Sequence, residues 1–343
     1  MNTIDIVVTW VDGNDPEWQA EKVKYQKKRT GDVRTSRYRE WGFLKYWFRS
    51  IEKNAPWVRY IHFVTWGHVP TWLDTSNPKL KIVNHKDFIP EQYLPTFSCR
   101  PIEFNLHRIK DLSETFVYFN DDMYLMQPTT EKDFFVNGLP CDVGIVDATI
   151  VNGETNDGDH VASQNLYTSL IYNLMAINRN FDKQQCIRKN IKKWYSLKYG
   201  SLLSKTVLLR PWKKFTGFYT IHCPYSYLKS TFLDVWRKEP ELVENACRHK
   251  FRNPQDISSR LLSFWQLAEG NFYPRSPKAG VARSISANEE KNKSICSEIE
   301  NHAFKMMCIN DDYHGDNYEQ VRDLYLAAFE KAFPTKSVYE KGV

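Results

Sequence analysis

The chain has 343 residues, and its 42% hydrophobic and 15% aromatic content supports a packed core in one large α/β domain or two domains and excludes a globally disordered chain. Its 47 basic and 41 acidic residues leave a formal net charge of +6, and the sequence shows no finger, recognition-helix or RNA-binding motif, so we expect no nucleic acid partner. Because no run approaches the roughly 20 apolar residues that span a bilayer and the first residues do not resemble a signal peptide, we expect a cytoplasmic chain, with peripheral association at the inner face of the plasma membrane left open.

Strands and helices alternate through the first third of the sequence. This order predicts right-handed crossovers between the strands of a mostly parallel sheet. The predicted elements are a strand over 4–11, a helix over 16–28, a basic loop over 27–39, an amphipathic helix over 40–54, and strands over 60–66, 80–83 and 116–119.

The first predicted strand ends in the turn cluster Asp-Gly-Asn-Asp-Pro over 12–16. A carboxylate after an N-terminal strand of a parallel sheet is well placed to contact a nucleotide. Asp12 is therefore a candidate functional residue, although Asp12 and Asp15 could equally form the turn and cap the next helix.

The segment 94–112 is a polar loop followed by a helical pattern through Leu106, Ile109 and Leu112. A loop that enters a helix N-terminus is a natural phosphate site, and Arg100 could hold a phosphate through paired donors. The alternative is an ordinary surface arginine.

Asn120, Asp121 and Asp122 follow the apolar strand Phe-Val-Tyr-Phe. A continuously apolar strand is buried on both faces of a parallel sheet, and its carboxyl end is where such sheets bind ligands. Adjacent carboxylates and an amide supply the hard oxygen ligands that suit Mg²⁺ or Mn²⁺. A simple turn is the competing interpretation.

The second half of the chain is expected to add helices and further strands. Its predicted elements are a strand over 141–151, a polar loop over 152–160, a helix over 166–177, a basic segment over 183–214, a strand over 215–221, helices over 225–236 and 258–268, a strand over 304–309 and a helix over 318–333. The basic segment could contact anionic lipid or an acidic polysaccharide, or it could be a solvated helical region.

Three further sites in this half are candidates for chemistry. Arg252 is a second possible phosphate ligand. The strand over 304–309 delivers Asn310, Asp311 and Asp312, and two acidic strand ends at one sheet edge would strengthen the case for a metal and phosphate site. His222 follows a predicted strand and could be a general base, although an unassigned histidine is more often structural.

The seven cysteines are scattered, odd in number and without a Cys-x-x-Cys pair. This pattern disfavours a zinc site or a disulfide framework, so we expect reduced thiols. They are Cys99, Cys141, Cys186, Cys223, Cys247, Cys296 and Cys308.

Several of these stretches resemble the Stealth family of bacterial capsular polysaccharide phosphotransferases and the animal N-acetylglucosamine-1-phosphotransferase. The resemblance to its first two regions lies in Ile4 to Pro16, in Arg49 to Trp57, and in Leu94-Pro95-Thr96-Phe97 through Asn120-Asp121-Asp122. His222-Cys223-Pro224 and Cys308-Ile309-Asn310-Asp311 resemble the third and fourth regions more loosely. One departure is Ser98-Cys99, where the family commonly has Asn-Ser, and the role of these two positions is open.

The resemblance implies metal-dependent transfer of a sugar 1-phosphate from a nucleotide-sugar, for example a UDP-hexose or UDP-N-acetylhexosamine, to an oligosaccharide or lipid-linked glycan in bacterial capsular or cell-surface polysaccharide synthesis, with release of a nucleoside monophosphate. The implied fold is a mostly parallel Rossmann-like sheet flanked by helices, with a helical insertion. The catalytic candidates are then Asp12, Arg100, Asp122, His222 and Arg252. The nucleotide-binding candidates are Trp10, Asp12, Gly13, Asn310 and Asp311. The metal ligands for Mg²⁺ or Mn²⁺ would be Asp121, Asp122 and Asn310.

We expect one continuous catalytic unit built from 1–150, with the first two family-like regions, and from 151–343, with the helical insertion and the other two. Two rival functions remain. One is a metal-dependent glycosyltransferase that releases a nucleoside diphosphate. The other is a glycan-binding module without turnover, which would expose several of the 11 tryptophans on one face.

Overall fold

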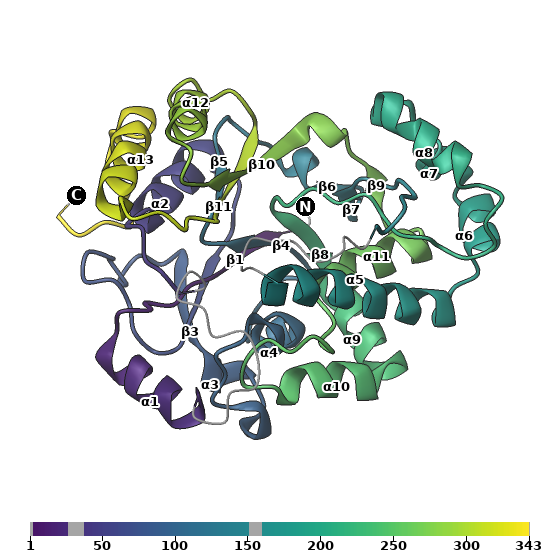
Figure 1. The fold of residues 1–343 in the computed structure, drawn as a ribbon, viewed down its shortest axis with the longest axis horizontal. Coiled ribbons are helices and arrows are strands. Elements are labelled where there is room, and N and C mark those ends of the chain that lie inside the picture. Colours follow the sequence, from purple (N-terminus) through teal and green to yellow (C-terminus); the bar gives the residue numbers. More distant parts are fainter. Residues whose placement is uncertain (1–2, 27–37, 151–159, 343) are drawn as a thin grey trace.

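The computed structural model describes residues 3–26, 38–150 and 160–342, with only the backbone described for 160–166. Its central sheet has the strand order β3-β2-β1-β4-β8 (Figure 1). The first four strands in sequence are parallel, and β8 is antiparallel to β4. The expected mostly parallel α/β fold is thereby confirmed. The strands are β1 (Ile4–Thr9), β2 (Ile61–Thr65), β3 (Leu80–Asn84), β4 (Thr115–Asn120) and β8 (Tyr225–Leu228).

Both faces of this sheet are covered, which explains why its strands are continuously apolar. Successive side chains of a strand point to opposite faces. Ile6 and Val8 of β1 belong to one buried cluster, whereas Val7 belongs to another. Val117 and Tyr118 of β4 divide between the two clusters in the same way.

Helices from distant parts of the chain supply these two clusters. The first cluster includes residues of α2 (Leu44–Asn54), α12 (Glu289–Glu300) and α13 (Tyr318–Ala332), which lie together in Figure 1. The second includes residues of α3 (His85–Phe88), α4 (Cys99–Asn105), α5 (His160–Asn180), α9 (Lys229–Lys238), α10 (Pro240–Arg248) and α11 (Arg260–Glu269). Helix α1 (Pro16–Gln26) buries Trp18 in a small separate cluster.

Two smaller sheets complete the fold. One has the order β10-β11-β5 and consists of β5 (Met123–Leu125), β10 (Gly280–Ile285) and β11 (Met306–Asp311). The other consists of β6 (Phe135–Val136), β7 (Leu139–Asp142) and β9 (Tyr273–Pro274). Since β5 begins three residues after β4 ends, Asp121 and Asp122 form the junction between the central sheet and the first small sheet.

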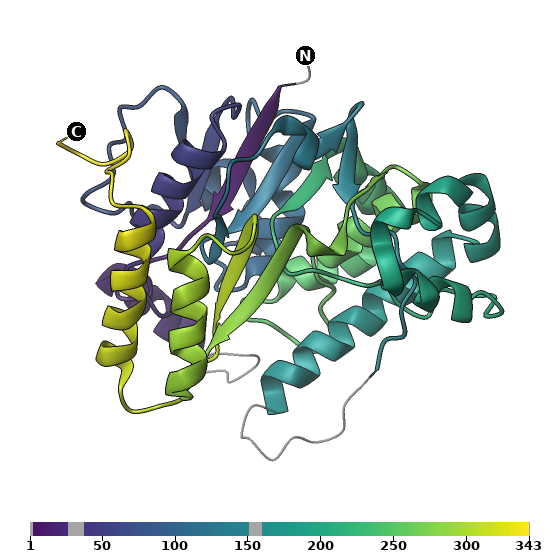
Figure 2. The same cartoon turned by 90° about the horizontal axis from the view of Figure 1, so that it is seen from above.

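Short helices at the periphery form a separate layer. Helices α6 (Lys183–Lys189), α7 (Ile191–Trp194) and α8 (Leu203–Leu208) lie at one end of the molecule, away from the central sheet in both views (Figures 1 and 2). None of the helices in the described part of the chain combines the length and apolar character needed to cross a bilayer. The seven cysteines, all within the described ranges, form no disulfide bond, and six of them are buried.

The predicted strand over 215–221 is wrong, and the strand over 141–151 is shorter than predicted. Only β7 forms in the latter, and the two stretches meet in a single bridge between Val146 and Phe218. Their backbones pair irregularly because Gly217 has a φ of 154°, and Asp147 N donates to Gly217 O at 3.0 Å. Such a glycine interrupts a ladder, although its neighbours have strand-forming side chains.

Two predicted helices are displaced. The first residues of the helix predicted over 225–236 form β8, because Tyr225 and Tyr227 pair with β4 before α9 starts. In the loop before β4, Ser98 Oγ accepts a hydrogen bond from Arg100 N at 3.3 Å and caps α4. The helix predicted through Leu106, Ile109 and Leu112 is thus displaced toward the N-terminus, because α4 ends at Asn105 and a 3₁₀ turn follows over Leu106–Arg108. Ser98 is thus an N-cap residue.

Some predictions fall on residues outside the described part of the chain. These are 27–37 of the basic loop, with the last two residues of the first predicted helix, Val151 at the end of the strand predicted over 141–151, and 152–159 of the polar loop. The glycan-binding alternative is not supported, because only Trp212 among the 11 tryptophans, all within the described residues, is exposed.

Candidate active site

The carboxyl edge of the central sheet gathers segments that are distant in sequence. Thr9 is the register partner of Asn120, so the residues that follow β1 and β4 leave the sheet side by side. β8 runs the opposite way and begins at Tyr225, which pairs with Tyr118. The segment just before β8 therefore reaches the same edge, and it carries His222.

Strand β11 approaches this edge from the small sheet. Cys308 is the antiparallel partner of Met123, and Ile309 N donates to Asp122 O at 2.8 Å. The acidic end of β11 therefore lies beside the acidic end of β4, which is the condition under which the sequence favours a metal and phosphate site. Asn310 continues the strand, and its Oδ1 lies 3.5 Å from Cys308 Sγ.

Asp122, His222 and Cys308 converge in one cluster. One ligand atom from each lies within 4.8 Å of the others. Asp122 Oδ1 is buried and has no hydrogen-bond partner within the described residues. Burial raises the pKa of Asp122 to about 6, and burial together with Asp122 raises the pKa of the Cys308 thiol well above its usual range. Cys308 is thus mainly in its thiol form.

A second group of carboxylates borders this cluster. Burial raises the pKa of Asp121 well above its usual range, and the nearby charges of Asp122 and Glu40 raise it further. Glu40 accepts hydrogen bonds from Trp10 Nε1 at 2.9 Å and from Gly42 N at 2.6 Å. Burial also raises the pKa of Glu40, with a smaller contribution from Asp12.

These carboxylates fit a divalent cation. Within the described ranges, none of Glu40, Asp121 and Asp122 forms an ion pair, so their mutual repulsion is not relieved by a protein cation. The unpartnered Asp122 Oδ1 is a free ligand atom. Carboxylate and amide oxygens suit Mg²⁺ or Mn²⁺, and an adjacent imidazole or thiol also suits softer metals.

The other side of the cluster is basic. Burial lowers the pKa of His222 to about 3, and the charges of Arg260 and Arg252 lower it further. His222 Nδ1 lies 3.0 Å from Tyr225 Oη. His222 is therefore a neutral imidazole between a carboxylate and two guanidinium groups.

Arg100 lies in a different environment from the one predicted. Its Nη1 donates to Glu103 Oε2 at 3.1 Å in a buried ion pair. Burial opposes the charge of Arg100, but Cys99, Glu103 and Asp256 together raise its pKa. Tyr118 Oη, 3.4 Å from Glu103 Oε1, connects this pair to the central sheet. The described structure therefore does not present Arg100 as an unpaired phosphate ligand, because Glu103 already neutralises it.

The turn after β1 has clear structural roles. Asp12 Oδ1 accepts from Asn14 N at 2.8 Å, and Asp12 N donates to His68 Nε2 at 2.8 Å. A Cβ atom on Gly13 would lie 1.9 Å from Tyr38 O, so only glycine fits there. Both residues are at the predicted edge, and the turn interpretation of Asp12 also holds.

Asp311 is paired with a side chain that the sequence did not suggest. Its Oδ2 lies 3.0 Å from Arg39 Nε, and its Oδ1 accepts from Tyr313 N at 3.1 Å. Asp312 is exposed. Asn310 lies beside the cluster, where its Oδ1 contacts Cys308 Sγ and its Nδ2 donates to Arg283 O at 3.4 Å.

Sequence reasoning missed three residues of this site. Glu40 stands at the start of an amphipathic pattern without any strand before it. Arg260 is the first residue of α11, and Cys308 was named among the reduced thiols and in the fourth family-like stretch but was given no role in the site. A local pattern could not identify them, because each reaches the site through a contact between distant segments.

Known proteins resemble this chain over its whole length. It is 43% identical to a capsular polysaccharide phosphotransferase WcwK of Streptococcus pneumoniae, with 99% of each chain covered. It is 37% identical to the receptor polysaccharide phosphotransferase WefC of Streptococcus oralis, covering 99% of this chain and 100% of that one. The galactosyltransferase LgtC, a solved structure, matches 94% of this chain and 95% of its own at 10% identity, but its TM-score of 0.38 is too low to support an argument.

An α/β fold with carboxylates, a neutral histidine and arginines at its carboxyl edge, in a chain with these relatives, defines an enzyme of the phosphotransferase class. Two family descriptions match the sequence: Stealth protein CR1, conserved region 1, over residues 2–30, and Stealth protein CR2, conserved region 2, over residues 37–141. The chain belongs to the Stealth family. The two matched regions contain Asp12, Glu40 and Asp122, whereas His222 and Cys308 lie outside them.

Proposed function

We propose that this enzyme transfers a sugar 1-phosphate from a nucleotide-sugar to a hydroxyl of a growing glycan, in the synthesis of a capsular or other cell-surface polysaccharide. The observation that carries the proposal is the convergence of Asp122, His222 and Cys308 at the carboxyl edge of the central sheet, with His222 kept neutral by burial and by the charges of Arg260 and Arg252. The names of the full-length relatives support the same reaction class. The reaction releases a nucleoside monophosphate.

His222 is the proposed general base. A neutral imidazole can take the proton of the attacking hydroxyl, whereas an imidazolium could not. Its low pKa in the free enzyme arises from burial and from Arg260 and Arg252. A donor whose phosphates pair with these arginines would offset their charge, raise the pKa of His222 and strengthen it as a base.

Arg252 and Arg260 are the proposed ligands of the donor phosphates. Phosphoryl transfer places negative charge on the equatorial phosphate oxygens, and guanidinium groups near them stabilise that charge. Arg100 stays in this proposal as a residue that positions the loop before β4, since its charge is balanced by Glu103.

The residues at the acidic side would hold a divalent cation and the nucleotide. Asp121, Asp122 and Asn310 are the proposed ligands of Mg²⁺ or Mn²⁺, and such an ion neutralises phosphate charge when bound. Glu40 adds a carboxylate next to them. We assign nucleotide contacts to the turn after β1, with Trp10, Asp12 and Gly13, and to Asp311. The acceptor is an oligosaccharide or lipid-linked glycan on the cytoplasmic side of the membrane.

Analysis of the products tests which bond breaks. Incubation with a competent donor and acceptor should give nucleoside monophosphate by chromatography and a phosphodiester in the glycan by phosphorus NMR, in equal amounts. Nucleoside diphosphate in stoichiometric yield, with no phosphorus in the glycan, would contradict the proposal and support a glycosyltransferase.

The variant His222→Ala tests the base. Its turnover should fall by about 10²–10⁴-fold while nucleotide-sugar binding persists. His302→Gln is the matched control, because His302 packs against Phe333 instead of lying in the cluster, and it should keep full turnover. A loss of less than about fivefold for His222→Ala in a chemistry-limited assay would remove His222 from the mechanism.

A further inference from the structure

The region around the peripheral helices α6, α7 and α8 is rich in positive charge. Residues 183–214, here called the basic lobe, contain ten Lys and Arg residues and no Asp or Glu. These ten charges exceed the formal net charge of +6 for the whole chain. The rest of the protein is therefore net acidic, whereas the basic lobe, whose helices α6, α7 and α8 lie at one end of the molecule (Figure 1), has a large positive net charge.

The basic lobe also exposes large apolar side chains. Leu197 is 89% exposed, Leu208 is 71% exposed and Trp212 is 55% exposed. Ile191 and Val207 of the same lobe are also exposed. Single exposed apolar residues are common on proteins, but a group of them between basic residues is the composition of a membrane-surface segment.

The fold holds this surface in place. Lys183 is buried, and its Nζ donates to Leu209 O at 2.6 Å and to Trp212 O at 2.9 Å, which ties the start of α6 to the end of α8. Trp194 is fully buried inside the lobe. Trp194 belongs to the second buried cluster and packs against Phe215 and Phe272, so the exposed apolar side chains extend from an ordered scaffold that is anchored on the main core.

Most of the lobe's charge is not neutralised by the protein. Lys205 pairs with Asp147 at 2.6 Å. The exposed residues Arg188, Lys189, Lys192, Arg210 and Lys213 form no ion pair within the described residues. Arg210 and Lys213 flank the exposed Trp212, so cations and apolar side chains share one stretch of chain.

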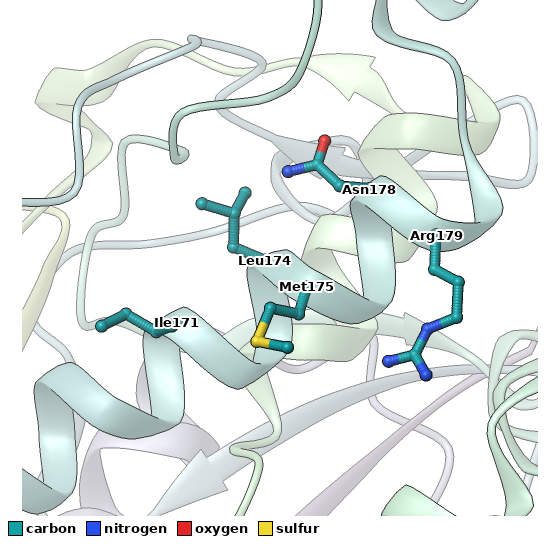
Figure 3. Close-up of a pocket in the computed structure, with 5 residues that line it drawn as sticks. All are labelled: Ile171, Leu174, Met175, Asn178 and Arg179. Carbon is teal, nitrogen blue, oxygen red and sulfur yellow. The ribbon is translucent and has the colours of Figure 1, made fainter.

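An apolar hollow on α5 adjoins the lobe. It has a volume of about 400 Å³ and is lined by Ile171, Leu174, Met175, Asn178 and Arg179 (Figure 3). Asn178 O accepts a hydrogen bond from Lys214 Nζ at 2.9 Å, and Asn178 Oδ1 accepts one from Phe215 N at 2.9 Å. These bonds connect α5 to Lys214, the last residue of the basic lobe. The hollow therefore adds apolar surface on α5 next to the lobe.

We propose that the basic lobe docks the enzyme on the surface of an anionic lipid bilayer. Its lysines and arginines face the anionic headgroups, and Leu208 and Trp212 enter the boundary between headgroups and acyl chains. A soluble polyanion would use the charges but would leave the leucines and the tryptophan in water, so the exposed apolar groups favour lipid. This inference goes beyond the transfer reaction and does not depend on it.

Flotation of the purified enzyme with vesicles tests the docking without any substrate. The enzyme should bind vesicles of phosphatidylcholine with phosphatidylglycerol, should bind pure phosphatidylcholine weakly, and should be released by high salt. In vesicles that contain brominated lipid, tryptophan fluorescence should be quenched, and Trp212→Phe should remove most of that quenching, because Trp212 is the exposed tryptophan.

Paired variants separate charge from apolar insertion. Arg210→Gln with Lys213→Gln should weaken binding to anionic vesicles by about 25-fold, since each basic residue near the surface contributes roughly fivefold. Leu208→Gln with Trp212→Ser should weaken it by at least about tenfold. The controls are Lys86→Gln with Lys336→Gln, which changes the net charge equally on other elements, and Leu233→Gln, which removes a side chain that is 57% exposed on α9.

Both controls should bind vesicles like the parent enzyme, and thermal unfolding should show that all variants are folded. Equal binding to neutral and anionic vesicles, or no binding to either, would overturn the proposal. So would a result in which the charge variant loses binding, the apolar variant keeps it, and a soluble acidic polysaccharide displaces the vesicles. That pattern would identify the lobe as a polyanion site.

Discussion

Asp122 joins three segments that are distant in the sequence. Its backbone bonds to β11, and its side chain lies with His222 and Cys308. Burial keeps its pKa near 6, so its charge changes in the range where enzymes work. Metal binding needs the carboxylate form, and protons compete with the metal at such a site.

We predict that stabilisation by Mn²⁺ or Mg²⁺ depends on pH through this residue. At pH 5 Asp122 is mostly protonated and at pH 7.5 it is mostly ionised, so the rise in melting temperature on adding Mn²⁺ should be larger at pH 7.5. Thermal unfolding of the enzyme with and without Mn²⁺ measures this directly. Asp122→Asn should show little metal-induced shift at either pH, while Asp133→Asn, in an ion pair with Lys305, should behave like the parent. A shift of the same size at both pH values in the parent enzyme would contradict the prediction.

At the scale of elements, helix α2 connects the core to the C-terminal part of the chain. Arg49 on α2 is buried and donates two hydrogen bonds to Glu340, at 2.8 and 3.0 Å, and one to Phe333 O at 2.8 Å. Glu340 is also buried. The last residues are therefore held against α2 by a buried ion pair, and its two members depend on each other.

We predict that Arg49→Met lowers the free energy of unfolding by about 3–5 kcal/mol, because it leaves the buried Glu340 carboxylate without a partner. Denaturant unfolding at neutral pH measures the loss. Arg49→Met with Glu340→Leu should recover part of it, since no unpaired charge then stays buried. Arg237→Met, which removes an exposed ion pair with Asp234, is the control and should cost less than about 1 kcal/mol. A cost that small for Arg49→Met would show that the pair is not structurally important.

For the whole molecule, several buried histidines couple stability to pH. Burial lowers the pKa of His85 to about 3 and that of His107 to about 4, both below the ordinary value of 6.5. Between these pKa values and pH 6.5 the unfolded chain binds protons that the folded chain does not, so each group makes stability fall as pH decreases. Asp121 and Asp122 act in the opposite sense, because burial raises their pKa.

We predict that His107→Gln weakens the loss of stability between pH 6.5 and 4.5 by up to about 1.4 kcal/mol per pH unit, because it removes one of these groups. Denaturant unfolding at several pH values gives the slope. His249→Gln is the control of opposite sign: its hydrogen bond to the Asp256 carboxylate raises the pKa of His249, so His249 contributes stability at low pH that is lost as pH rises, and its removal should steepen the loss on acidification. Identical slopes in the parent enzyme and His107→Gln would refute the prediction.

Local patterns in the sequence determined much of this protein. The apolar runs that became β1 and β4 and the acidic residues after β4 were predictable, because a strand buried on both faces and a polar turn at its end are properties of adjacent residues. The amphipathic pattern of α2 and α13 was predictable for the same reason. The resemblance to the Stealth family was also a property of local motifs, and the full-length relatives confirm it.

The tertiary structure alone decided which of these parts form the site. The reversed direction of β8 places His222 at the edge, and the antiparallel pairing of β11 with β5 places Cys308 beside Asp122. The sequence predicted a strand before His222, which is wrong, and named Arg100 as a possible phosphate ligand, whereas the fold buries Arg100 in an ion pair with Glu103. In each case the outcome depends on a partner that is distant along the chain, and propensity over a short window carries no information about pairing between such segments.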